Sequence, residues 1–395
     1  MSYVDIAVGI GLFLAFFAVV LVLSVQRFVS VPAASAMEEY RAKAISMFES
    51  LFSTGGTPTN WESTPLAPSE LGLTTTIYKF PVTIEEPDIS DRQNEPVIAK
   101  LEFDEECSNK TWNNTIRTYS STLNETGFEF SNPVICSSQY LNESYVRFKV
   151  NISKGEKKIF YIYYSEDDGI PGPNYTMTYS TASWVPASGD SWTEAAELSN
   201  WYIYGGAGAS PSTNSTFKMR GATSIQIKDT FSSASKLGIT YNPASTISGV
   251  SNGWYLSAWL YVDDMSNLAA VNASISDGSE TITANVTGDM TDGEWYHLER
   301  NLSSSQWAGW SSFNASKGID SITFFMVNSS AGLTKQLKVD ELHFGLRPLE
   351  VVAFPEETEK VVSRKKIDAL NNLTYDELKE AIGEDYKFRI EITGG

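Results

Sequence analysis

The sequence predicts a mainly β protein, with an N-terminal transmembrane helix and a helical stalk followed by two antiparallel β-sandwich domains. Three observations lead to this prediction. The chain opens with a long apolar run, most of the remainder alternates apolar and polar residues with a period of two, and turn-forming residues separate the alternating runs. Short strands at such spacing favour antiparallel sandwiches over a parallel sheet covered by helices.

The apolar run covers residues 6–25, and none of its 20 residues is charged. As a helix it would be about 30 Å long, which matches the hydrocarbon core of a bilayer. We therefore expect residues 1–30 to form a transmembrane helix, which Pro32 would end or kink. The alternative is a cleaved signal peptide, since residues 31–36 are loosely similar to a cleavage site, although no Lys or Arg precedes the apolar run.

Four residues of this helix suggest contact with other helices. Ala7, Gly11 and Ala15 lie four residues apart, so they share one face on which another backbone could approach closely. Asp5 could pair there with the α-amino group of a neighbouring subunit. The alternatives are that Asp5 lies in the headgroup region, where a charge costs little, and that small residues are simply common in membrane helices.

A helical stalk is expected over residues 31–54. Ser35 and Glu38 form a capping-box pattern near its start, an apolar stripe at helical spacing follows, and Gly55 lies just past its end. Because one face of this helix is apolar, it should pack on another part of the protein.

The alternating runs divide into two regions. Residues 55–168 are expected to form the first sandwich, and residues 169–348 to form a second domain inserted into it. Residues 349–395 would return to the first sandwich with a short helix opened by Thr374 and a final strand, which could not be stable alone. The run at 255–262 has apolar residues at both odd and even positions, so we expect a central strand that is covered on both faces.

Charge and glycosylation signals bear on partners and compartment. The chain has 48 acidic and 29 basic residues, a net charge of −19, which argues against nucleic acid as a partner. Many Asn-x-Ser/Thr triplets indicate a glycoprotein whose bulk is extracellular, on a cell membrane that the chain crosses once, although an Asn-, Ser- and Thr-rich composition alone would produce some of them. The triplets begin at Asn109, Asn113, Asn124, Asn142, Asn151, Asn174, Asn214, Asn272, Asn285, Asn301, Asn314, Asn328 and Asn372.

The chain has two cysteines, Cys107 and Cys136. An extracellular location, an even count and the lack of metal-binding spacing predict that they form one disulfide. The alternative is a pair of buried free thiols.

Several stretches resemble archaeal surface proteins with a type IV pilin-like N-terminus. They are the apolar helix with an acid at its fifth residue, GTPTNW with LGLTT, NEPVIAKLEF, FYIYYS, and the ending from VSRKKIDALNNL onward, which together cover roughly half of the chain. The resemblance implies a surface protein whose N-terminal helix could assemble with others, for example in a filament. The chain lacks the basic-Gly cleavage site that precedes the helix in pilin precursors.

Residues 180–348 resemble a jelly roll of the carbohydrate-binding-module or laminin-G type. The stretches that carry this resemblance are GATSIQI, GWYLSAWLYV, GEWYHLERNLS and LKVDELHFG. It implies that the second sandwich is a jelly roll, and it supports the fold more than a ligand.

Two kinds of ligand follow from these expectations. Sugar binding needs aromatic rings at loops or edges with a few polar partners, and otherwise such rings only pack loops. The candidates are Trp201, Tyr202, Tyr204, Trp254, Trp307 and Trp310. The second ligand is structural Ca²⁺, for which Asp289, Asp292 and Glu294 lie in a Gly-containing turn, and Asp340 lies where some similar jelly rolls bind calcium.

Catalysis is not predicted. GVSNG at 249–253 matches the G-x-S-x-G pattern, but a strand rather than a helix follows Ser251. The only histidines are His297 and His343. Adjacent acidic residues on a strand point to opposite faces, so they do not form the facing pair that glycoside hydrolysis requires.

The leading interpretation is therefore a membrane-anchored surface glycoprotein, a structural or adhesive element that assembles through helix–helix contacts. Its partners would be membrane lipid and further copies or other membrane helices. The alternative is a membrane-tethered protein that binds polysaccharide through the jelly roll.

Overall fold

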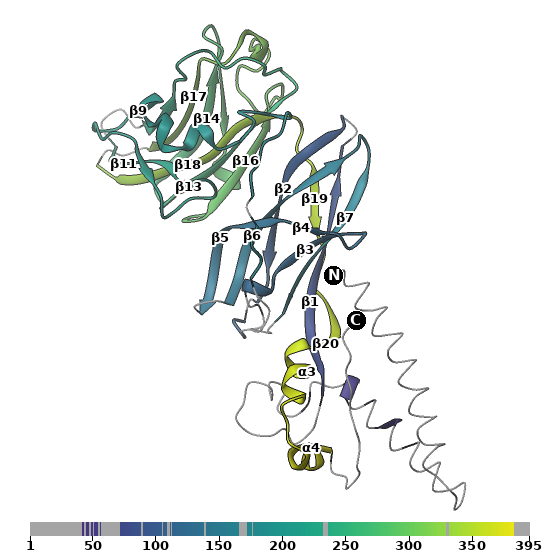
Figure 1. The fold of residues 1–395 in the computed structure, drawn as a ribbon. Coiled ribbons are helices and arrows are strands. Elements are labelled where there is room, and N and C mark those ends of the chain that lie inside the picture. Colours follow the sequence, from purple (N-terminus) through teal and green to yellow (C-terminus); the bar gives the residue numbers. More distant parts are fainter. Residues whose placement is uncertain are drawn as a thin grey trace, which may run out of the picture.

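The structure is a computed structural model, and it describes residues 72–382 with gaps of one to six residues, together with a few residues between 42 and 56 (Figure 1). The predicted transmembrane span, the helix-assembly residues Asp5, Ala7, Gly11 and Ala15, and the predicted final strand lie outside the described residues. In the part of the chain that is described, no helix has the length and apolar character needed to cross a membrane.

The described chain is mainly β and forms several antiparallel sheets with few helices, as the sequence predicts at this level. The first sandwich pairs a sheet of order β19-β1-β7-β3-β4, in which β20 also pairs with β1, with a sheet of order β2-β6-β5. Between the two sheets lies an apolar core that includes Val82, Phe148 and Ile162. The strands are β1 Thr74–Glu85, β2 Arg92–Glu102, β3 Arg117–Ser120, β4 Glu125–Thr126, β5 Phe128–Ser137, β6 Tyr140–Ile152, β7 Lys157–Ser165, β19 Glu350–Ala353 and β20 Glu357–Val362.

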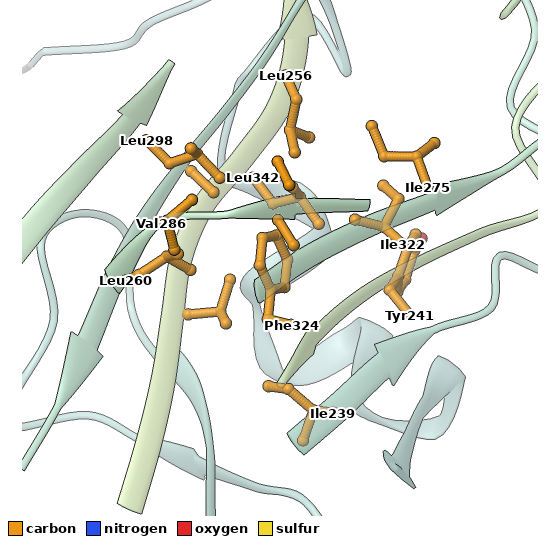
Figure 2. Close-up of a cluster of buried hydrophobic side chains, with 14 of the residues drawn as sticks. Ile239, Tyr241, Leu256, Leu260, Ile275, Val286, Leu298, Ile322, Phe324 and Leu342 are labelled. Carbon is orange, nitrogen blue, oxygen red and sulfur yellow. The ribbon is translucent and has the colours of Figure 1, made fainter. Parts of the chain in front are cut away.

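The second sandwich has a larger core, part of which is shown in Figure 2. One sheet has the order β10-β11-β18-β13-β16, with β8 paired to β18, and the other has the order β15-β14-β17-β12-β9. Alternate residues of each strand enter the core between them, among them Leu260, Phe324 and Leu342. The strands are β8 Trp184–Val185, β9 Trp201–Gly205, β10 Ser212–Asn214, β11 Ser224–Thr230, β12 Lys236–Tyr241, β13 Tyr255–Val262, β14 Leu268–Ser276, β15 Thr281–Asn285, β16 Trp295–Asn301, β17 Ser321–Asn328 and β18 Thr334–Gly345.

The chain leaves the second sandwich through β18 and returns to the first, where β19 and β20 pair with β1. Two short helices follow, α3 Arg364–Leu370 and α4 Tyr375–Ile382. The predicted capping box is confirmed, since the Thr374 amide donates to Glu377 Oε2 at 2.7 Å and the Glu377 amide donates to Thr374 Oγ1 at 3.3 Å. Short 3₁₀ turns occur at Asn113–Thr115, Ser191–Thr193, Ala195–Asn200, Thr287–Asp289 and Ala315–Lys317.

The predicted central strand is confirmed as β13, which lies between β18 and β16 with both faces covered. Leu256, Leu260 and other even-numbered residues enter the core of the second sandwich. On the opposite face Trp259 packs against Tyr145 of the first sandwich, with the two ring centroids 4.9 Å apart. The cover on this face is therefore the β2-β6-β5 sheet of the first sandwich.

Buried charges reinforce this junction. Arg147 on β6 of the first sandwich has a fully buried side chain, and its Nη2 lies 2.5 Å from Oε2 of Glu341 on β18 of the second. Arg220 lies 3.6 Å from the other oxygen of Glu341 and 3.8 Å from Glu129 of the first sandwich. Since each charge has an opposite partner across the junction, the two sandwiches are held in one orientation.

A β-bulge puts Glu341 in position for this role. Ser257 pairs with His343 and Trp259 pairs with Asp340, so two residues of β18, Glu341 and Leu342, lie opposite Ala258. Glu341 takes up the change with a φ of 47°, in the left-handed region. The extra residue turns the Glu341 carboxylate toward the first sandwich while Leu342 stays in the core.

Candidate functional site: a cleft at the junction of the two sandwiches

A cleft of about 240 Å³ lies where the two sandwiches meet. Its floor is the outward face of β13, β16 and β18, and its opposite wall is the middle of β2, residues 95–98. The connection from β18 to β19 closes one end together with Trp184 of β8. Because both sandwiches contribute walls, the shape of the cleft depends on their relative orientation.

Three polar side chains of the floor lie side by side in a row on the paired strands β13 and β16. Ser257 Oγ on β13 lies 3.0 Å from Nε2 of His297 on β16, within hydrogen-bonding distance. The other ring nitrogen of His297, Nδ1, lies 3.7 Å from Oε1 of Glu299. Strand pairing explains this arrangement. Ser257 lies directly opposite Glu299 and Trp259 lies directly opposite His297 in the β13–β16 ladder, so Ser257 and His297 are diagonal neighbours.

The ring of His297 is fixed by stacking. It lies nearly parallel to the Trp259 indole, with an interplanar angle of 15° and centroids 4.4 Å apart. The indole is held in turn, because its Nε1 donates to Glu341 Oε2 at 3.1 Å. The carboxylate that joins the two sandwiches thus also orients the floor of the cleft.

His343 forms the second imidazole of the floor. Its ring stacks on Trp184, with centroids 3.9 Å apart and an interplanar angle of 20°. Burial lowers the pKa of His343 to about 4, so the ring is neutral near pH 7. Its Nδ1 lies 3.2 Å from the backbone oxygen of Glu341, which can only accept, so Nδ1 carries the proton and Nε2 is a free acceptor position on the ring.

The β2 wall is held by its own ion pairs. Arg92 lies against Glu86 and donates from Nη1 to Glu95 Oε1 at 3.0 Å, and all three side chains are almost fully buried. Thr181 Oγ1 donates to the second oxygen of Glu95 at 3.0 Å. With both its oxygens bonded, the Glu95 carboxylate is a fixed part of the wall.

The aromatic residues that the sequence suggested for sugar binding do not line this cleft. The structure corrects two of them: Trp201 and Trp307 are buried, and their indole N–H groups donate to the backbone oxygens of Trp192 and Asn301. Neither ring can stack on a sugar, because its faces pack in the core of the second sandwich.

The other four lie elsewhere on the second sandwich, and one of them, Tyr202, is 50 % exposed. Trp254 packs partly buried against the core, and Tyr204 packs against Phe325 with ring centroids 5.0 Å apart. Trp310 is 43 % exposed. Sequence reasoning missed Trp184, Tyr255 and the histidines of the cleft, because their neighbourhood arises only when strands distant in sequence pair.

The structure does not bring the calcium candidates together. Asp340 is buried and its oxygens accept hydrogen bonds from the amides of Met219 and Arg220 and from the Thr193 hydroxyl, so its lone pairs are engaged. Asp289 pairs with Arg300 at 2.8 Å, and Asp292 accepts a hydrogen bond from the Met265 amide. Within the described ranges, no group of three acidic, His or Cys residues could hold a metal ion.

Two further predictions concern covalent chemistry. The disulfide between Cys107 and Cys136 is confirmed. Among the glycosylation signals, Asn272 and Asn328 are buried in strands of the second sandwich. Asn124, Asn151, Asn174, Asn285 and Asn372 are exposed, and Asn109 lies outside the described residues. Glycosylation itself stays a prediction.

Comparison with known proteins yields no match to any family model and no match among curated proteins. Among solved structures, the family 11 carbohydrate-binding module from Clostridium thermocellum, in complex with a β-1,3-1,4-mixed-linked tetrasaccharide, is 17 % identical. The alignment covers 38 % of this chain and 91 % of that one, with a TM-score of 0.27.

A second solved structure, a carbohydrate-binding module specific for non-crystalline cellulose, is 11 % identical over 40 % of this chain and 94 % of its own, with a TM-score of 0.27. A third solved structure, from work on the promiscuous specificity of carbohydrate-binding modules of the β-sandwich superfamily, is 9 % identical over 64 % of this chain and 99 % of its own, with a TM-score of 0.31. None of these three solved structures supports the predicted likeness to pilins.

Proposed function

We propose that this protein binds carbohydrate and holds one sugar unit of a polysaccharide in the junction cleft. The observation that carries the proposal is that aromatic rings of the second sandwich and polar groups of both sandwiches line one small cavity. A concave site with a few placed polar groups among apolar walls is the usual form of a small-ligand site. At about 240 Å³ the cleft is smaller than a typical drug-binding pocket, which suits a single sugar unit.

The lining fits the chemistry of a sugar. A pyranose ring presents C–H groups that pack on aromatic faces, and hydroxyls that donate to carboxylates and imidazole nitrogens. Tyr255 is half-buried at the cleft and offers an aromatic ring with a hydroxyl. Glu299, whose side chain is 38 % exposed, offers an acceptor carboxylate, and the neutral ring of His343 offers a second acceptor.

The surroundings proposed for this activity are those of a surface protein. The Cys107–Cys136 disulfide suits an oxidising compartment outside the cytosol. The N-terminal apolar helix would tether the chain to the membrane, and the second sandwich would act as an inserted jelly roll. Structural assembly through Asp5, Ala7, Gly11 and Ala15 takes second place, because these residues lie outside the described chain.

The proposal is tested with the full chain. A glycan microarray first identifies a polysaccharide class, and titration calorimetry then compares wild type with Tyr255→Ala. We expect the variant to bind at least about 10-fold more weakly, since it loses an aromatic contact inside the cleft. Trp310→Ala is the matched control, because Trp310 is an exposed aromatic outside the cleft.

Two results would contradict the proposal. One is the absence of binding to every glycan on the array. The other is a loss of affinity in Trp310→Ala with none in Tyr255→Ala, which would place the sugar site away from the junction.

A further inference from the structure

The cleft floor contains a nucleophile, a base and an orienting acid in the order that acyl-transfer chemistry needs. A serine hydroxyl becomes a nucleophile when a histidine nitrogen stands within about 2.6–3.2 Å to take its proton, and when a third group orients the histidine. Ser257 Oγ and His297 Nε2 are 3.0 Å apart. Glu299 Oε1 lies 3.7 Å from His297 Nδ1, at ion-pair distance on the far side of the ring.

The fold holds this set in place more firmly than a single surface hydrogen bond would. All three residues lie on paired strands, β13 and β16, whose register fixes their spacing. The face of the His297 ring lies on Trp259, and the Trp259 N–H is anchored by Glu341. The imidazole is therefore oriented by stacking as well as by the carboxylate, which is the preorganisation that a general base requires.

We propose that Ser257 is the nucleophile of an esterase site, with His297 as general base and Glu299 as positioning residue, that removes acyl groups from carbohydrate hydroxyls. The inference rests on the proposed carbohydrate binding for the nature of the substrate. The hydrolysis itself does not depend on carbohydrate binding, so it can be measured with any small ester that enters the cleft.

The reaction proceeds in two balanced steps. Ser257 Oγ attacks the acyl carbon and gives its proton to His297 Nε2, the ester C–O bond breaks, and the leaving sugar oxygen takes that proton. Water then attacks the acyl-serine and gives a proton to His297, and the bond to Ser257 Oγ breaks. The proton returns to Oγ and a carboxylic acid leaves, so the net reaction consumes one water for each ester bond.

The chain provides its own matched control. Ser251 belongs to the G-x-S-x-G pattern but is exposed in a turn before β13, whereas the serine that lies within hydrogen-bonding distance of His297 is Ser257. Sequence pattern alone would select Ser251, whereas geometry selects Ser257. Comparing substitutions of the two serines therefore shows whether activity depends on the sequence motif or on the contact with His297.

The experiment treats the full chain with a fluorophosphonate probe, maps the labelled residue by mass spectrometry, and measures hydrolysis of p-nitrophenyl acetate. We expect the label on Ser257. Ser257→Ala and His297→Gln should each lower kcat/KM about 100-fold or more, and Ser251→Ala should leave it unchanged. Glu299→Gln should lower kcat with KM unchanged, because it affects the orientation of His297 and not ester binding.

The outcomes are distinguishable from failure of the proposed function. Labelling of Ser251, or no labelling and no hydrolysis above that of Ser257→Ala, would overturn the esterase even if glycans bind. Retention of glycan binding by Ser257→Ala together with loss of labelling would support both proposals. Should Ser257→Ala fold poorly, competition of probe labelling by phenylmethylsulfonyl fluoride on wild type gives the same answer, since a reactive Ser257 must be blocked by it.

Discussion

Replacing Arg147 by leucine removes the guanidinium that joins the two sandwiches and leaves the carboxylate of Glu341 buried beside Arg220 alone. Removing one partner of a buried ion pair typically costs about 3–5 kcal/mol, because the remaining charge stays desolvated. Since Arg220 lies 3.6 Å from Glu341 and keeps part of the compensation, we expect the lower end, a loss of about 3 kcal/mol. Urea unfolding followed by tryptophan fluorescence measures this loss.

Arg147→Leu should also reverse the sign of the contribution that Glu341 makes to the pH dependence of stability. Burial alone would raise the pKa of Glu341, but Arg147 and Arg220 outweigh it and hold the pKa below its usual range. In the wild type this carboxylate therefore stabilises the fold above its unfolded pKa, and the contribution is lost as pH falls through the folded pKa. Without Arg147 burial should dominate and raise the pKa, so the variant should regain stability on acidification from pH 7.

A double-mutant cycle supplies the control. Glu341→Gln keeps an acceptor for the Trp259 N–H while removing the charge, so Arg147→Leu with Glu341→Gln should be less destabilised than the sum of the two changes by about 2 kcal/mol. A loss of under 1 kcal/mol in Arg147→Leu, with additive effects in the cycle, would show that the ion pair does not hold the junction.

Two further predictions concern other parts of the molecule. Because the pKa of His343 is lowered to about 4, stability should fall as pH drops from 6.5 to 4, by about 3 kcal/mol, and His343→Gln should flatten that part of the profile in urea unfolding at stepped pH. The contribution of His343 to the free energy of unfolding is fully present above pH 6.5. If stability falls between pH 6.5 and 4 as steeply in His343→Gln as in the wild type, the lowered pKa is not the cause. The Cys107–Cys136 disulfide closes a loop with a sequence separation of 29, so the double Cys→Ser variant should lose about 3.6 kcal/mol of unfolding free energy, and equal stability of the two proteins would argue against that role.

Local pattern was enough to predict the elements. The run at 255–262, which is apolar at both odd and even positions, predicted a central strand covered on both faces. The Thr374–Glu377 pattern predicted the start of α4. Both signals lie within a few residues of chain. The disulfide was also predictable, since two cysteines in a chain expected to lie outside the cytosol leave one pairing.

The site was not predictable in the same way. Ser257 and His297 are 40 residues apart, and β18 brings His343 beside them only through a ladder interrupted by a bulge. Trp201 and Trp307 show the complementary error. An indole next to Gly, Ser and Asn reads as a loop residue, yet both rings pack in the core, where backbone oxygens accept hydrogen bonds from their N–H groups.

Glu341 connects the stability of the junction to the geometry of the cleft. One of its oxygens meets both Arg147 of the first sandwich and the indole N–H of Trp259, on which His297 lies. A change that loosens the junction should therefore also release the imidazole from its position beside Ser257. Arg147 does not line the cleft, yet Arg147→Leu should reduce fluorophosphonate labelling of Ser257 under conditions in which the protein is still folded. A distant core substitution that destabilises the fold equally, such as Phe324→Leu, should leave the labelling unchanged.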